Sequence, residues 1–178
     1  MNFHFRKITA FVLAVLMVIS IVKYFDVETH LRSWLKNSES NKPKYIVPFS
    51  LQDLDGKTRS ISEWSERRVL INFWATWCVP CRREMPLLQN LYLNKDAHNI
   101  EVIGIAVDEN ESVEDFIHEY GIEFPILIGQ SDAYEIMQQL GNTATTLPYT
   151  LVIEPDGLIT WRKNTEVKAE DLPAILGY

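Results

Sequence analysis

The chain has 178 residues, of which 47% are hydrophobic, and it carries 17 basic and 24 acidic side chains, a formal net charge of −7. This composition is typical of a globular protein, and the length allows one domain of ordinary size plus an additional segment. An acidic chain lacks the basic surface that phosphate binding requires, so we expect no nucleic acid among its partners.

The additional segment is at the N-terminus, where residues 8–22 read ITAFVLAVLMVISIV and contain no charge. Extended to residue 25, the stretch reaches the roughly 17–20 residues of a membrane-spanning helix. A cleaved signal peptide is the alternative, although no A-x-A sequence stands near the end of the run. Because Arg6 and Lys7 precede it, we predict residues 1–7 in the cytoplasm, 8–25 as a transmembrane anchor or signal peptide, and the rest outside the cytoplasm.

A polar linker is predicted over residues 26–44, and a single domain over residues 45–178. Beyond Lys23 the chain carries 14 basic and 24 acidic residues, a balance of −10, which describes an acidic exported domain. The domain opens with Phe49–Ser62, FSLQDLDGKTRSIS, whose alternation around Asp55-Gly56 predicts a β-hairpin.

Next comes Val69–Trp74, VLINFW, which is apolar except for Asn72 and predicts a strand covered on both faces. A helix is expected from about Cys78, with a kink at Pro86. The later patterns predict, in chain order, a strand over Ile100–Val107, a helix over 111–121, a strand over Phe124–Ile128, a helix over Ser131–Gly141, two strands within Tyr149–Trp161 and a closing helix over Lys168–Leu176. Because strands and helices alternate, the predicted class is α/β with a central, partly parallel sheet.

The chain has two cysteines, Cys78 and Cys81, in the stretch NFWATWCVPC. A structural zinc site needs four ligands, and the histidines are scattered, so no metal site is expected. A purely structural disulfide would close a very short loop and remove little unfolded-state entropy. A redox pair has a mechanism, because the start of a helix stabilises a Cys78 thiolate, the attacking form in disulfide exchange. Cys81, one turn further, would then resolve the mixed disulfide, and Pro80 suits the first helical turn.

The segment LINFWATWCVPCRREMP, residues 70–86, resembles the active-site segment of thioredoxin-fold proteins. It is most similar to that of the membrane-anchored, extracytoplasmic TlpA/ResA-like thiol–disulfide oxidoreductases. The resemblance extends over Tyr45–Tyr178 and includes the hairpin and TTLPYTLVIEPDG, in which Pro148 matches the family's cis-proline; the preceding NTATTL lacks the usual glycine-rich form. It implies a thioredoxin-like fold, with a central mixed sheet flanked by helices, and the apolar run predicts one N-terminal transmembrane helix before it.

The resemblance also implies roles for individual residues. Cys78 and Cys81 would be the redox-active catalytic pair, without a cofactor or metal. Asn72 stands where cytoplasmic thioredoxins carry a buried aspartate that moves the proton of the second cysteine, which an amide cannot do. Glu84 occupies the position given that duty in TlpA/ResA-like proteins; an ordinary first-turn acid favoured by the helix dipole is the alternative. The implied substrate-facing residues are Trp77, Val79, Pro80, Leu147 and Pro148.

The predicted function is the reduction of disulfides in exported proteins such as apocytochrome c, on the periplasmic or extracytoplasmic side of a bacterial inner membrane. The reductive direction rests on analogy, because the VP between the cysteines lacks the histidine of strongly oxidising members. A membrane thiol-transfer protein would supply electrons, since that compartment is held oxidising. Two alternatives stay open: a thiol peroxidase that uses Cys78, and a non-catalytic thioredoxin-fold binding module.

Overall fold

The computed structural model describes residues 13–17, 19–24 and 45–178. The chain divides into two units, Met1–Lys42 and Pro43–Tyr178, and each is described by itself. In the first unit, the described residues are helical. Among all described residues, no helix is both long and apolar enough to cross a membrane. The predicted anchor over 8–25 lies partly outside the described residues, and the predicted linker over 26–44 lies wholly outside them.

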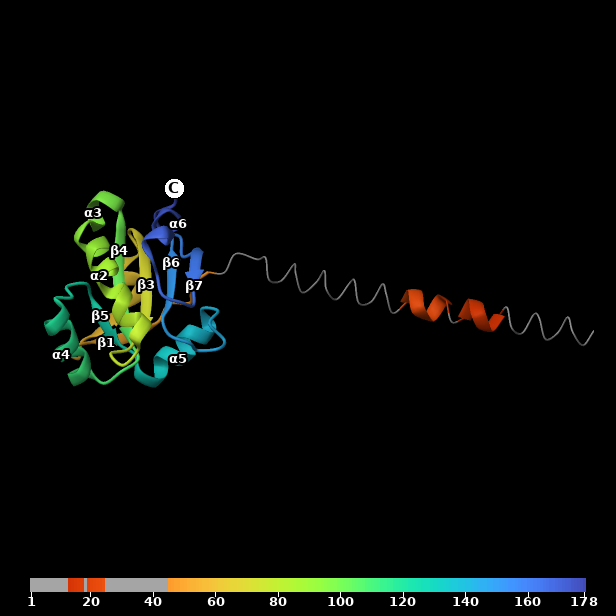
Figure 1. Cartoon of the computed structure of the whole chain (residues 1–178), viewed down its shortest axis with the longest axis horizontal. Coiled ribbons are helices and arrows are strands. Elements are labelled where there is room, and N and C mark those ends of the chain that lie inside the picture. Colours follow the sequence, from red (N-terminus) through yellow and green to blue (C-terminus); the bar gives the residue numbers. More distant parts are fainter. Residues whose placement is uncertain (1–12, 18, 25–44) are drawn as a thin grey trace, which may run out of the picture. The chain divides into compact units, whose positions relative to one another are not determined.

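The second unit is built on one seven-stranded sheet with the strand order β2-β1-β5-β4-β3-β6-β7 (Figure 1). The central strands β3, β4 and β5 run parallel, and the other pairings are antiparallel, so the predicted mixed sheet is confirmed. The strands are β1 (Ser50–Asp53), β2 (Thr58–Ser60), β3 (Arg68–Trp74), β4 (Ile100–Ala106), β5 (Ile126–Ile128), β6 (Tyr149–Ile153) and β7 (Ile159–Lys163).

Helices cover both faces of the sheet, as the apolar run in β3 predicts. Side chains of a strand alternate between faces, so Leu70 and Trp74 belong to one core cluster and Ile71 and Phe73 to the other. The first cluster receives apolar side chains from α2, α4 and α6, and the second from α5. The helices are α2 (Val79–Leu93), α3 (Lys95–His98), α4 (Asn110–Tyr120), α5 (Gln130–Gln139) and α6 (Leu172–Leu176).

The predicted hairpin is present, and its turn is held by a side chain. Asp53 Oδ1 accepts hydrogen bonds from the backbone N–H groups of Asp55 and Lys57, and Gly56 adopts a φ of 76°. The second strand ends at Ser60, which caps the 3₁₀ helix η1 (Ile61–Trp64), so the extended conformation stops earlier than the sequence pattern suggested.

The closing helix predicted over Lys168–Leu176 is wrong as a single element. The chain forms a 3₁₀ turn, η2 (Ala169–Asp171), followed by the short helix α6. The Asp171 carboxylate accepts hydrogen bonds from the Lys168 backbone N–H and from Lys163 Nζ, which ties the turn to β7. Pro173 then stands at the start of α6, where its missing N–H leaves no donor unpaired.

Candidate active site

The two cysteines lie at the junction of β3 and α2, as the sequence predicts. Cys78 is the N-cap of α2, with extended backbone angles, and Cys81 lies within the first turn. The two side chains form a disulfide, and Cys78 Sγ also accepts a hydrogen bond of 3.4 Å from the Cys81 N–H. Pro80 occupies the first turn of the helix and removes a donor that would otherwise be unpaired. The sulfur of Cys78 therefore faces the positive end of the helix dipole.

The two cysteines differ in exposure in the direction expected of a nucleophile and a resolving thiol. Cys78 is 5% exposed and Cys81 is 0% exposed, so Cys78 is the accessible member although it is itself largely covered in the disulfide. The side chains on either side of Cys78 are open to solvent: Trp77 is 63% exposed and Val79 is 60% exposed. An incoming protein can therefore contact these two apolar side chains beside the sulfur.

The Leu147–Pro148 peptide bond is cis, as predicted from the resemblance. Both residues line a cavity of about 350 Å³ together with Pro80, which brings three of the five predicted substrate-facing residues into one groove. Trp77 and Val79 do not line it. The remaining lining residues are Arg83, Lys163, Asn164, Thr165, Glu166 and Lys168. Arg83 and Glu166 form an ion pair across this groove at 2.6 Å.

Glu84 lies on the inner side of α2 and is 1% exposed. Its Oε1 accepts a 2.8 Å hydrogen bond from Asn72 Nδ2, and its Oε2 accepts a 2.6 Å hydrogen bond from the Val167 N–H. Burial raises the pKa of Glu84 to about 7, because desolvation disfavours the carboxylate, and the two hydrogen bonds act in the opposite direction. The alternative of a first-turn surface acid is wrong, because Glu84 is buried and lies beyond the first turn of α2.

Asn72 makes two hydrogen bonds inside the core. Its side chain is fully buried, and Nδ2 donates both to Glu84 and, at 2.8 Å, to Thr150 Oγ1 on the neighbouring strand β6. The sequence singled out Asn72 only for what it lacks, and it gave no signal for Thr150 or Val167. These partners are 12 to 95 residues away from one another along the chain, so a sequence pattern could not join them.

The loop that leads into Cys78 is anchored by a residue that the sequence did not single out. Thr76 donates its backbone N–H and its hydroxyl to Asp108 Oδ2, at 3.0 and 2.5 Å. Asp108 follows the buried run of residues 100–107, which contains β4, and a charged residue ending such a run was the available signal. Because β3 and β4 are parallel neighbours, their following loops meet at the same edge of the sheet.

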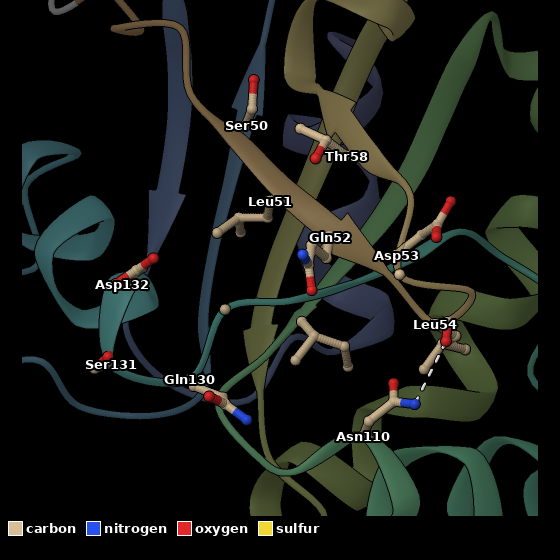
Figure 2. Close-up of a pocket in the computed structure, with 13 residues that line it drawn as sticks. Ser50, Leu51, Gln52, Asp53, Leu54, Thr58, Asn110, Gln130, Ser131 and Asp132 are labelled. Atoms are coloured by element: carbon tan, nitrogen blue, oxygen red, sulfur yellow. Dashed lines mark hydrogen bonds between the residues drawn. The ribbon is translucent and has the colours of Figure 1, made fainter.

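A second cavity, of about 470 Å³, lies apart from the cysteines, between β1 and the starts of α4 and α5 (Figure 2). Figure 2 shows Asn110 donating to the backbone oxygen of Leu54, with Gln130, Ser131 and Asp132 contributed by the start of α5. None of the predicted site residues lines this cavity. In the described part of the chain, no three His, Cys, Asp or Glu side chains gather as a metal site would require.

Comparison with known proteins agrees with this geometry. Residues 44–162 match the AhpC/TSA family. Thiol-disulfide oxidoreductase ResA of Halalkalibacterium halodurans is 32% identical over 152 residues, which cover 83% of this chain and 81% of that protein. ResA of Bacillus subtilis is 32% identical over 116 residues, 62% of this chain, and the match spans only 60% of the length of that relative.

Solved structures show the same fold. A thioredoxin-family thiol:disulfide interchange protein of Chlorobium tepidum superposes with a TM-score of 0.67 at 23% identity, covering 76% of this chain and 95% of its own. A putative thioredoxin of Neisseria meningitidis superposes with a TM-score of 0.62 at 29% identity, covering 74% of this chain and 86% of its own. The chain belongs to the AhpC/TSA family and, within the thioredoxin superfamily, to the ResA/TlpA-like thiol–disulfide oxidoreductases.

Proposed function

We propose that this chain reduces disulfides in exported proteins through Cys78 and Cys81. The observation that carries the proposal is the placement of the pair: Cys78 caps α2, and Pro80, which stands between the two cysteines, lines a groove with the cis Leu147–Pro148 bond. A partner disulfide can approach there along exposed side chains. The relatives named as thiol-disulfide oxidoreductases support the same reaction class.

The reaction begins with the dithiol form. The Cys78 thiolate, stabilised at the start of α2, attacks one sulfur of the substrate disulfide. The substrate S–S bond breaks, a mixed disulfide forms between Cys78 and the substrate, and the released substrate thiolate takes up a proton from water. Exposed Trp77 and Val79, together with the groove at Pro148, would hold the substrate segment during this step.

The second step needs a deprotonated Cys81. Glu84 lies one helical turn beyond Cys81 on the buried side of α2, and in its charged form it is a base of suitable strength, because its pKa is about 7. Glu84 accepts the Cys81 proton, and the resulting thiolate attacks Cys78 Sγ. The Cys78–Cys81 disulfide forms, and the second substrate thiolate leaves. Two electrons pass from the cysteine pair to the substrate.

The proton-transfer role predicts a kinetic effect for Glu84→Gln. Disulfide exchange should slow by about 10²-fold, the lower end for general-base catalysis, and its pH dependence between roughly pH 5 and 8 should flatten. Glu135→Gln is the control, because it removes an exposed carboxylate on α5, outside the groove. A Glu84→Gln protein with unchanged rates across this range would make water the proton acceptor.

The substrate and the direction belong to the same proposal. Apocytochrome c is the proposed substrate, and a membrane thiol-transfer protein is the proposed electron donor, because an extracytoplasmic reductant must be recharged across a membrane. A Cys81→Ser chain expressed in the source organism should retain its substrate as a mixed disulfide on Cys78, which mass spectrometry then identifies.

The matched control for this capture is Cys78→Ser, which should retain nothing. Capture that is independent of Cys78 would contradict the mechanism. If the reduced wild-type protein consumes peroxide but exchanges no disulfide, the protein is a thiol peroxidase instead. If Cys78→Ser preserves the cellular phenotype, the chain is a non-catalytic binding module.

The location is proposed from the N-terminal sequence. Arg6 and Lys7 precede the uncharged run 8–22, so residues 8–25 would anchor the chain in the bacterial inner membrane with the domain outside the cytoplasm. The chain should then be found in the membrane fraction. Protease added to intact spheroplasts should digest its domain. A soluble mature protein that begins after Ser20 would identify the segment as a cleaved signal peptide.

A further inference from the structure

Glu84 is surrounded by few groups that determine its proton affinity. From β3, Asn72 Nδ2 donates to one carboxylate oxygen, and from the C-terminal segment the Val167 N–H donates to the other. Two more distant charges act in opposite directions: Glu166 disfavours the carboxylate, and Lys163 on β7 favours it. Of these four neighbours, Asn72 is the only one that meets the carboxyl group with a side-chain hydrogen bond.

The two ends of the Asn72 amide differ in hydrogen bonding, and the difference indicates the role of this side chain. Nδ2 uses both hydrogens, one toward Glu84 and one toward Thr150. Oδ1 is buried and finds no hydrogen-bond partner among the described residues. A buried acceptor without a partner costs free energy, and an apolar side chain of similar size would fill the same space without that cost. The packing of the core therefore gives no reason for an amide at this position, whereas the donor side does.

We propose that Asn72 is a positioning residue that holds Glu84 in the carboxylate form and sets its affinity for the Cys81 proton. In the orientation that the structure has, both oxygens of Glu84 face donors, an arrangement that fits the charged form and not the acid. The hydrogen bond from Nδ2 thus offsets part of the desolvation of a carboxylate that is 1% exposed. Asn72 and Glu84 together then do what a single buried aspartate would do at the position of Asn72. This inference rests on the proposed role of Glu84 in disulfide exchange.

Asn72→Leu tests the proposal, because leucine keeps the branched shape of the side chain and removes the donor. A hydrogen bond to a charged group corresponds to a change of about 10- to 100-fold in proton affinity, so the pKa of Glu84 should rise by about one to two units. The measurement is a pH titration of the glutamate carboxyl ¹³C resonances in the oxidised full-length chain, with Glu84→Gln identifying the resonance. The pH profile of disulfide exchange should move upward by the same amount.

Thr150→Val is the matched control. It removes the other hydrogen bond of Asn72, also inside the core, and leaves the contact with Glu84 in place. The pKa of Glu84 should change by less than about half a unit in this variant. A merely structural role would make the two variants alike in stability and leave the titration of Glu84 unmoved in both. Asn72→Ala provides a second loss of the donor, without added volume, if Asn72→Leu does not fold.

The outcomes separate this inference from the proposed function. The titration is made on the oxidised protein and needs no turnover, so it stands whatever the substrate is. An unchanged Glu84 titration in Asn72→Leu or Asn72→Ala overturns the role of Asn72, even if the wild-type chain exchanges disulfides. A wild-type chain that exchanges no disulfides overturns the proposed function, even if the titration shifts. In a Glu84→Gln background, Asn72→Leu should produce no further shift of the pH profile.

Discussion

Glu84 lies in an environment that disfavours its charged form, and this gives Glu84→Gln a stability effect that depends on pH. Burial raises the pKa of the carboxyl group from an ordinary value of 4.5 to about 7 in the folded chain. The folded chain therefore binds the proton more tightly than the unfolded chain, and the free energy of unfolding falls as the pH rises from 4.5 through 7. One pKa unit corresponds to about 1.4 kcal/mol, so ionised Glu84 costs the folded state roughly 3 kcal/mol at pH 8.

Glutamine has the same shape and does not ionise, so the variant escapes this loss. The difference in unfolding free energy between Glu84→Gln and the unchanged chain should therefore shift in favour of the variant by roughly 3 kcal/mol between pH 4 and pH 8. Any constant cost of the new amide cancels in this comparison. The site also accommodates the amide, because a half-turn of the Asn72 side chain offers its unpartnered, buried Oδ1 as an acceptor for the new NH₂ group.

Urea denaturation of the oxidised protein at several pH values between 4 and 8 measures this difference. Glu166→Gln is the control with the opposite sign. Arg83 lowers the pKa of Glu166, so this carboxylate stabilises the folded chain above its ordinary pKa, and its loss should favour the unchanged chain as the pH rises. A stability difference for Glu84→Gln that is the same at pH 4 and pH 8 would refute the argument that burial disfavours the Glu84 carboxylate.

Three further predictions concern the cysteines, the active-site loop and the core. Alkylation of the reduced protein near neutral pH should label Cys78 before Cys81, because Cys78 caps the helix and is the less buried; the reverse order would exchange their roles. Asp108→Ala should lower the free energy of unfolding by about 2 kcal/mol, since two donors of Thr76 lose their acceptor, and equal urea midpoints would contradict this. Met85→Ala should cost about 2–5 kcal/mol in the same assay, because the Met85 side chain on α2 is fully buried in the core.

Local sequence signals determined several secondary-structure elements of this protein and the position of its cysteine pair. The hairpin at Asp55-Gly56, the buried strand β3 and the start of α2 at Cys78 each follow from residues that are neighbours in the chain, and all three are confirmed. The cysteine pair was identified in the same way, because its chemistry depends on a spacing of three residues and a helix start. The cis bond before Pro148 came from the family resemblance and is confirmed as well.

Only the tertiary structure decided how the surroundings of Glu84 are built. Sheet order places Asn72 of β3 directly opposite Thr150 of β6, and the return of the chain after β7 brings the Val167 N–H onto Glu84. The same packing removes Glu84 from water and raises its pKa, a shift that the position three residues beyond Cys81 led us to expect; the hydrogen-bond partners behind it could not be read from the sequence. Burial and hydrogen bonds between distant residues depend on which strands become neighbours, and no local pattern encodes that choice.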